Sequence, residues 1–341
     1  MASPFPNLPS SQRGDVHRIF LQSKVLEGNY WNDPTERECF VYTPKGYEQG
    51  KDYPVIIFLA GFAGTGEGML SRSLTDVSIA TRLDRWIAEG CAPFVGVFPD
   101  CMSSLGGTQF VDSPAIGEYA THFMTELIPL IKDQFSGMGK IGLTGRSSGG
   151  YGAICLAMQY PELISGVACH AGDMGFETAF VAELTQALLP LHLSGSPQEF
   201  LHNFWQKSRF SPADFAAFNL LCMSASYSPN LENDFPADIP IDIETGAIDW
   251  EVFRSWKQHD PVEMIENQQY QKALKSLAYL FIDVGRFDEY NLQFGARAFR
   301  QKLEKFGVEH IYEEFDGGHR GTTYRYDYSI PAMVTALSSK E

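Results

Sequence analysis

Apolar strands alternate with amphipathic helices along most of this 341-residue chain, and this alternation limits the possible folds more than any other feature. The clearest strand is 54–60 (PVIIFLA), a continuous β-branched and apolar run followed by glycines, which is typical of a strand buried on both faces. Residues 16–26 and 37–43 alternate apolar and polar residues, as half-buried antiparallel strands do. Further strands are expected at 94–99, 140–144, 164–169, 276–284 and 309–315, and helices at 77–89, 117–134, 149–160, 291–306 and 325–338. The pattern predicts an α/β fold with a mostly parallel, doubly wound sheet.

The alternation is interrupted between Phe176 and Ile265. This segment holds 13 acidic residues and four basic ones, a net charge of −9, and proline and glycine breaks separate its short helical stretches. We interpret residues 176–265 as a helical insertion, a cap or lid on an α/β core formed by residues 1–175 and 266–341. The alternative is an ordinary solvated helical excursion. If the segment is a cap, its apolar sides should face the site and its acidic sides should face water.

Charge and composition exclude several kinds of partner. The chain has 26 Lys and Arg residues against 42 Asp and Glu residues, a net charge of −16, so double-stranded nucleic acid and anionic membrane surfaces are poor partners. The longest apolar run is far shorter than the roughly 20 residues that span a bilayer. The first 15 residues lack the apolar segment of a secretory signal, so a cytoplasmic protein is expected.

The cysteines and histidines do not form a metal-binding pattern. The six cysteines include no CxxC pair and are expected to be reduced thiols, mostly in the core. The eight histidines include no HxH or HExxH motif. The glycine-rich stretch 61–68 has Glu67 where a phosphate-binding loop needs lysine, and its glycine spacing differs from that of dinucleotide-binding loops. No metal or cofactor is therefore expected.

A candidate nucleophile stands between the expected strand at 140–144 and the helix at 149–160. The segment GRSSG has the form G-x-S-x-G with Ser147 at its centre. A serine on a tight strand-to-helix turn holds a strained backbone conformation, and its neighbours leave no room for a Cβ at the two glycine positions. The turn exposes the hydroxyl above the sheet edge, beside a helix N-terminus that favours developing negative charge. Ser148 is not favoured, because Arg146 rather than glycine stands two residues before it.

A serine nucleophile needs an imidazole as base and a carboxylate that orients it, and in a doubly wound sheet these follow later strands in the order Ser, Asp, His. His319 follows the last expected strand on a Gly-Gly turn, where a base can reach the serine. The strand at 276–284 offers two acids. We favour Asp288, on the loop after the strand, over Asp283, which still lies within it. Asp283 should instead be satisfied by nearby backbone or a buried donor.

Two backbone N–H groups are expected to hold the oxyanion of the reaction. One belongs to Ser148, directly after the nucleophile, and the other to Phe62, in the loop after the first buried strand. Gly61 from the same loop, and His170 and Asp173 from the exit of strand 164–169, are assigned to the substrate pocket.

Together these segments resemble the α/β-hydrolase fold and, within it, the putative-esterase (esterase D-like) family, which includes S-formylglutathione hydrolases, feruloyl esterases, enterochelin-esterase-like proteins and mycolyltransferases. The resemblance covers about residues 16–173 and 276–335 and leaves the insertion out. It is carried by VYTPKGYEQGKDYPVIIFLAGFAG, FPDCMSSLGGTQFVDS, GRSSGGYGA, HAGD, DVGRFDEY and GGH. It implies an α/β-hydrolase core and a triad of Ser147, Asp288 and His319. The family usually has His-Gly before the oxyanion residue, where this chain has Ala60-Gly61.

The sequence thus predicts a serine carboxylic-ester hydrolase that works through an acyl-enzyme on a small-molecule or oligomeric ester. Acyl transfer to an alcohol or sugar uses the same triad and is the nearest alternative. A thioesterase similar to S-formylglutathione hydrolase is another, although an acidic cap over the site would repel a substrate that bears carboxylates. A non-catalytic binding member of the fold is less consistent with an intact triad in the expected order.

Overall fold

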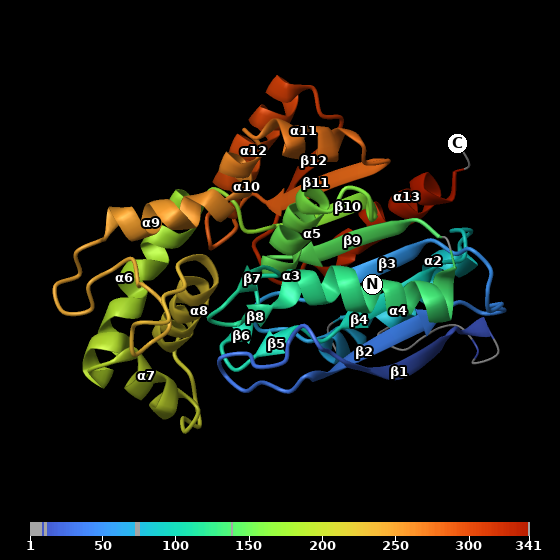
Figure 1. Ribbon diagram of the computed structural model, residues 1–341. Coiled ribbons are helices and arrows are strands. Elements are labelled where there is room, and N and C mark those ends of the chain that lie inside the picture. Colours follow the sequence, from blue (N-terminus) through green and yellow to red (C-terminus); the bar gives the residue numbers. More distant parts are fainter. Residues whose placement is uncertain (1–8, 10–11, 72–75, 138, 340–341) are drawn as a thin grey trace.

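The computed structural model describes residues 9, 12–71, 76–137 and 139–339 (Figure 1). Most of the N-terminal segment that was compared with a secretory signal, residues 1–8 and 10–11, lies outside the described residues. Within the described part, no helix combines the length and the apolar character that crossing a membrane requires.

The centre of the molecule is an eight-stranded sheet in the order β1-β2-β4-β3-β9-β10-β11-β12. The strands β1 and β2 pair antiparallel, as do β2 and β4, and all the other neighbours pair parallel. The strands are β1 Asp15–Gln22, β2 Glu36–Thr43, β3 Val55–Leu59, β4 Val95–Pro99, β9 Ile141–Arg146, β10 Ile164–His170, β11 Tyr279–Gly285 and β12 Ile311–Phe315. Two small antiparallel pairs lie outside this sheet: β5 Met102–Ser103 with β6 Gly106–Gly107, and β7 Asp112–Ser113 with β8 Gly117–Glu118.

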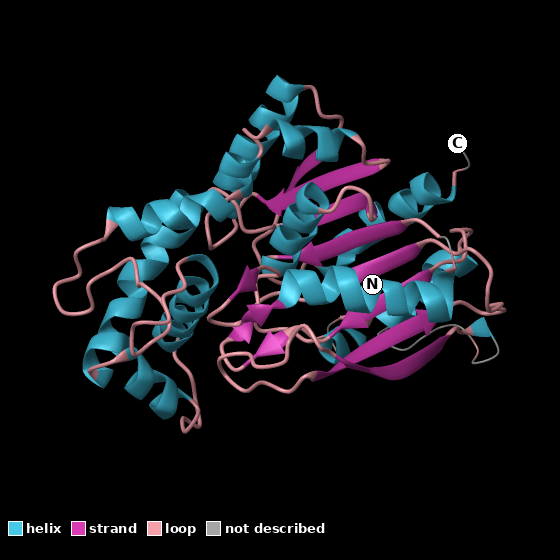
Figure 2. Ribbon diagram, in the orientation of Figure 1, coloured by secondary structure: helices cyan, strands magenta, loops and turns pink. Residues whose placement is uncertain are grey.

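Helices cover both faces of the sheet, as the alternation predicts (Figure 2). The α-helices are α1 Gly66–Leu70, α2 Ile79–Ala88, α3 Tyr119–His122, α4 Ile128–Ile131, α5 Ser148–Gln159, α6 Phe176–Ser194, α7 Pro197–Phe204, α8 Pro212–Tyr227, α9 Trp250–Trp256, α10 Pro261–Met264, α11 Gln268–Lys275, α12 Leu292–Phe306 and α13 Tyr326–Ser338. The helix expected at 117–134 runs without a break from residue 119 to 136, as α3 and α4, each followed by a π-helical turn, Phe123–Leu127 and Lys132–Ser136.

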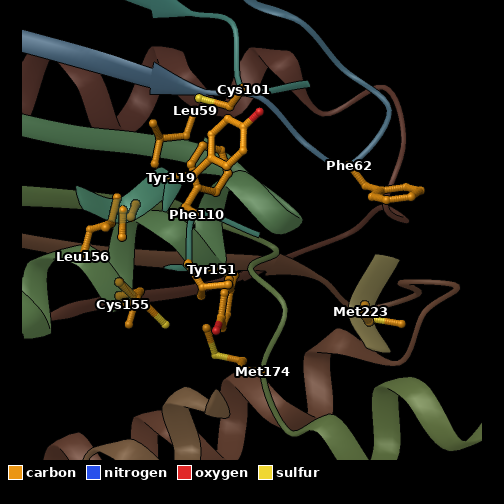
Figure 3. Packing of buried hydrophobic residues seen from close by; sticks show 14 of the residues in the cluster. Leu59, Phe62, Cys101, Phe110, Tyr119, Tyr151, Cys155, Leu156, Met174 and Met223 are labelled. Carbon is orange, nitrogen blue, oxygen red and sulfur yellow. The ribbon is translucent and has the colours of Figure 1, made fainter. Parts of the chain in front are cut away.

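The side chains of β3 pack into the hydrophobic clusters on both faces of the sheet. Val55, Ile57 and Leu59 belong to a large buried cluster with side chains of α5, α12 and α4. Ile56 and Phe58 belong to a second cluster with side chains of α2 and α13. Because successive side chains of a strand point to opposite faces, a strand buried on both sides must be apolar throughout, and all five residues of β3 are buried. Figure 3 shows part of the larger cluster, from Leu59 in the sheet to Met223 in the insertion.

The strand β1 is shorter than expected. It ends at Gln22; the Ser23 N–H still donates to the Thr35 carbonyl just before β2, while the Ser23 hydroxyl donates a hydrogen bond to Glu126 at 2.5 Å. The apolar residues Val25 and Leu26, which extended the alternating pattern, therefore belong to a turn that packs beside helix residues 119–136.

The insertion lies beside the carboxyl ends of the parallel strands (Figure 1). Its helices α6, α7 and α8 pack against one another, and α9 follows them along the chain. The last short helix, α10, packs against α5 and α12 of the α/β body. Asp260 also accepts hydrogen bonds from the backbone N–H groups of Gly175 and Phe176, so both ends of the insertion are joined where it leaves the body.

Candidate active site

Ser147 lies on the sharp turn between β9 and α5. Its backbone has φ 58° and ψ −129°, a combination that residues other than glycine rarely adopt. Its two flanking glycines are held by close packing: a Cβ on Gly149 would lie 2.1 Å from the carbonyl oxygen of Leu59, and one on Gly145 would lie 2.4 Å from the carbonyl carbon of Gly149. The G-x-S-x-G spacing is therefore required by the packing of the turn against β3.

The backbone around Ser147 anchors the turn to the neighbouring strand. The Ser147 N–H lies 3.0 Å from the carbonyl oxygen of His170 and 3.1 Å from that of Ala171, at the exit of β10. Ser148 is the first residue of α5, so its N–H belongs to the group at a helix N-terminus that has no intrahelical acceptor. Gly61 lies against the same turn, because a Cβ on it would be 3.2 Å from the Arg146 carbonyl oxygen.

His319 and Asp288 form a buried pair, and His319 lines the same cavity as Ser147. Asp288 stands in the loop after β11, and its Oδ2 lies 2.8 Å from His319 Nδ1. Its Oδ1 accepts a hydrogen bond from the Tyr290 N–H at 2.9 Å, and the Tyr290 ring packs edge-on against the imidazole. The Glu289 carboxylate accepts the His319 N–H at 2.7 Å, which fixes the backbone of the loop after β12. Two successive residues of one loop thus hold both the ring and the backbone of His319.

A cavity of about 450 Å³ brings these groups together. The α/β body contributes Gly61, Phe62, Ala63, Gly64, Arg146, Ser147, Ser148, Asp173, Tyr290, Leu292, His319 and Arg320, and the insertion contributes Ala179, Phe180, Glu183, Phe215 and Asn219. Of the residues predicted from the sequence, Ser147, His319, Phe62, Ser148, Gly61 and Asp173 therefore lie at one cavity. Asp288 lies behind His319, to which it is hydrogen-bonded.

Two buried carboxyl groups face this cavity. Asp173 accepts hydrogen bonds from the hydroxyls of Ser147, at 3.4 Å, and Ser148, at 3.2 Å, and burial raises its pKa to about 6. Glu183 on α6 accepts a hydrogen bond from the Asn219 amide at 2.9 Å, and burial raises its pKa to about 7. The expectation that the acidic side chains of the insertion face water is therefore wrong for Glu183, although Phe180 and Phe215 do face the cavity as expected.

His170 does not line this cavity, and its assignment to the substrate pocket is corrected. Its Nδ1 lies 2.7 Å from Asp283 Oδ1, and its Nε2 lies 2.9 Å from the Ser329 hydroxyl on α13. Asp283 also accepts a hydrogen bond from Arg325 Nε at 2.6 Å, so this acid has the buried donors that were expected for it. Ser329, His170 and Asp283 resemble a second Ser-His-Asp arrangement, but all three are almost fully buried. No substrate can reach this serine, so the arrangement is structural.

Several residues at the cavity were not found from the sequence. Arg146, Tyr290 and Arg320 are immediate neighbours of predicted residues or of the acid loop, and that position could have indicated them. Phe180, Glu183, Phe215 and Asn219 come from the insertion, where nothing in the local sequence indicates a site. Among the residues that the structure describes, no group of three or more His, Cys, Asp or Glu side chains is placed to hold a metal ion.

Comparison with known families and structures gives a consistent result. A family model described as "Putative esterase" matches residues 34–336. A search of curated protein sequences found no match.

Solved structures with a similar fold include several esterases. A ferulic acid esterase is 20% identical over 96% of this chain and 100% of its own, with a TM-score of 0.59. An S-formylglutathione hydrolase from Agrobacterium tumefaciens is 16% identical over 95% of this chain and 96% of its own, with a TM-score of 0.57. A CE1 ferulic acid esterase from Anaeromyces mucronatus, in complex with ferulic acid, is 19% identical over 97% of each chain, with a TM-score of 0.55. At these identities the likeness concerns the fold, and it agrees with the α/β-hydrolase fold that the sequence predicts.

Proposed function

The chain belongs to the putative esterase family and is a carboxylesterase-type hydrolase, and we propose that it hydrolyses carboxylic esters through an acyl-enzyme formed on Ser147. One observation carries this proposal. The strained turn that presents Ser147 opens into the same cavity as His319, and His319 is held by a buried carboxylate. This is the arrangement of nucleophile, base and orienting acid that acyl transfer requires.

In the proposed first half-reaction, the Ser147 hydroxyl attacks the carbonyl carbon of the ester and gives its proton to His319 Nε2. Asp288 holds the Nδ1–H of the imidazole, so Nε2 is the nitrogen that is free to accept. The hydroxyl must first turn away from the Asp173 carboxyl, to which it donates in the structure. His319 then gives the proton to the leaving alcohol, and the acyl group remains on Ser147.

The negative charge on the carbonyl oxygen is proposed to be held by the backbone N–H groups of Ser148 and Phe62. The first stands at the N-terminus of α5, whose dipole favours an anion there. In the second half-reaction a water molecule gives its proton to His319 and attacks the acyl carbon. The bond between the acyl carbon and the Ser147 oxygen then breaks, His319 returns the proton to this oxygen, and the acid is released.

We further propose that residues 176–265 act as a cap on a core formed by residues 1–175 and 266–341. The support is the lining of the cavity, to which α6 and α8 contribute two aromatic side chains, an acid and an amide. These residues stand opposite the loops that carry the proposed triad, so they would contact the parts of the ester that do not react.

A pair of serine variants tests the mechanism. Ser147→Ala should lower kcat on an aryl acetate by about 10⁴-fold or more, while Ser148→Ala should keep measurable activity because its backbone N–H is unchanged. A fluorophosphonate should label the wild-type protein and Ser148→Ala at Ser147, as peptide mass analysis would show. Labelling at Ser148, or full activity of Ser147→Ala, would contradict the assignment. Addition of an alcohol during turnover distinguishes hydrolysis from acyl transfer, because only a transferase forms the new ester as its main product.

A further inference from the structure

Glu183 is a buried acid in the part of the cavity wall that the insertion supplies. It lies on α6, is 7% exposed, and shares the cavity with Phe180, Phe215 and Leu292. Among the residues that the structure describes, its carboxyl group has one hydrogen-bond partner, the Asn219 amide on α8, and no lysine or arginine within 4.0 Å. In the described part of the chain the acid therefore forms no salt bridge, and a positive charge on His319 works against the rise of its pKa.

The carboxyl group has acceptor capacity that the protein does not use. An ionised carboxylate offers about four lone-pair sites on its two oxygens, and Asn219 occupies one site on Oε2. Burial of such a group without compensating hydrogen bonds is costly. Asp173, in the same cavity, differs in this respect, because each of its oxygens accepts a hydrogen bond from a serine hydroxyl. Among the described residues, Glu183 is thus the carboxyl group at the cavity with one oxygen, Oε1, that accepts no hydrogen bond.

We propose that Glu183 determines specificity by accepting a hydrogen bond from a donor group on the ester substrate, a hydroxyl or an ammonium, carried on a short apolar stem. This inference rests on the proposed function. Glu183 Oε1 would accept the hydrogen bond of the donor group. The apolar side chains beside it would pack against the stem. Asn219 acts as a positioning residue, because its hydrogen bond to Oε2 fixes the plane of the carboxyl group. Glu183 itself takes no part in bond making or breaking.

The two donor chemistries make different demands on the acid. A hydroxyl group needs only an acceptor, which an amide oxygen can also supply. An ammonium group needs the negative charge, and the net charge of −16 on the chain would raise its local concentration. A methyl group in the same place would leave the carboxylate without a donor, and this is the kind of loss by which a polar site rejects an apolar analogue.

The experiment uses aryl esters of a linear alkanoic acid and of its ω-hydroxy and ω-amino analogues, in several chain lengths. A second series carries the same three groups on the alcohol side of an acetate ester. In at least one series, kcat/KM of the wild-type protein should be roughly ten- to a hundred-fold higher for a donor-bearing ester than for its methyl-terminated match. Preference for the ω-amino ester identifies an ammonium, and equal preference for both donors identifies a hydroxyl.

Variants at this position assign the preference to Glu183. Glu183→Leu should abolish it, whereas Glu183→Gln should keep a preference for the hydroxyl and lose any further preference for the ammonium. Glu177→Gln is the matched control, because Glu177 is an exposed acid on the same helix and pairs only loosely with Lys257, at 3.4 Å. Fluorophosphonate labelling of Ser147 at the wild-type rate shows that each variant keeps its active-site fold.

The results separate this inference from the proposed function. Equal cleavage of all esters by the wild-type protein, or a donor preference that survives in Glu183→Leu, overturns the role of Glu183 and leaves the esterase proposal intact. If no ester is cleaved and Ser147 is not labelled, both proposals are overturned together.

Discussion

Replacing Asp288 and Asp283 by asparagine, one at a time, should give two variants that fail in opposite ways. Each aspartate lies within 2.8 Å of a histidine Nδ1, His319 in one case and His170 in the other, and each is at most 3% exposed. The two pairs are thus matched in local geometry and burial. They differ in two respects: the far side of the histidine is the cavity with Ser147 for one pair and the buried Ser329 for the other, and Asp283 also pairs with Arg325.

For Asp288→Asn we expect a loss of activity with little loss of stability. An asparagine amide in this place favours the wrong tautomer of His319, and the same change in a well-studied Ser-His-Asp triad lowers kcat by about 10⁴-fold. The Tyr290 N–H can still donate to the asparagine oxygen, so the free energy of unfolding should fall by only about 1 kcal/mol.

For Asp283→Asn we expect the reverse. Asp283 is 1% exposed and is the buried acceptor for Arg325, whose other partner, Glu313, is partly exposed. Removal of one partner of a buried ion pair leaves an uncompensated charge and costs about 3–5 kcal/mol. With an unfolding entropy of about 2.1 cal/mol/K per residue, 1 kcal/mol corresponds to roughly 1.4 °C for a chain of 341 residues, so Tm should fall by about 4 °C or more.

The measurement is kcat on an aryl acetate, taken well below Tm, together with the thermal unfolding of each variant. The corresponding histidine variants serve as a check. His319→Gln should lose activity, as Asp288→Asn does, and His170→Gln should lose stability, as Asp283→Asn does. If Asp283→Asn is folded but inactive while Asp288→Asn is close to wild type, the assignment of the acid is wrong, and with it the role given to the loop after β11.

Three further changes test other parts of the reasoning. Gly149→Ala should abolish labelling of Ser147 by a fluorophosphonate, because the new Cβ would lie 2.1 Å from the Leu59 carbonyl oxygen; normal labelling would mean that the turn can relax. Burial raises the pKa of Glu183 from 4.5 to about 7, so the contribution of this residue to the free energy of unfolding should fall as pH rises through this window. Denaturant unfolding should then show Glu183→Gln equal to wild type near pH 4 and about 3 kcal/mol more stable near pH 8, and equal stability at both pH values would contradict a raised pKa. Replacing residues 176–259 by a glycine-rich linker, which keeps α10 on the body, should leave aryl acetates cleavable and erase selectivity among longer acyl chains; unchanged selectivity would show that the segment is not a cap.

Much of the fold could be predicted because the inner strands of the parallel part of the sheet, such as β3 and β4, are apolar and buried along their whole length. The run PVIIFLA has no polar residue to place against solvent, so helices on both sides of the sheet were the one arrangement that could bury it. The turn at Ser147 was predictable for a related reason. Two glycines at fixed spacing are a local signal, and the close approach of the Leu59 carbonyl explains why both are needed.

His170 was misassigned because its place at a strand end was considered without the alternation of the strand. On β10, Ala168 belongs to the cluster with α13, and a residue two positions later points to the same face. His170 accordingly packs on Tyr326 and reaches Ser329 on α13, while Val167 and Cys169 face the other side with α5. The parity of the strand, which is readable in the sequence, therefore excluded His170 from the pocket.

Glu183 and Asn219 could not be predicted in this way. They stand 36 positions apart on two helices of the insertion, and their hydrogen bond exists only because α6 packs on α8. The helix α6 is mostly apolar, with exposed Leu189 and Leu193 as well as buried Phe176 and Leu184, so no clear amphipathic stripe marks which side faces the body. A single acid on such a helix is indistinguishable by sequence from a solvated one.

The cavity is lined partly by the α/β body and partly by the insertion, and this allows substrate recognition to change separately from the reaction. Ser147, Asp288 and His319 follow β9, β11 and β12, so hydrogen bonding within the parallel sheet sets their mutual positions. The side chains from α6 and α8 are held by packing within the insertion and by contacts of these helices with β6, β7 and α12 of the body, none of which belongs to the main sheet. Substitutions on the insertion can therefore move the recognition groups without moving the reacting ones. Changes at Glu183 should alter the ratio of kcat/KM values between esters, whereas changes at Asp288 should lower kcat for every ester by a similar factor.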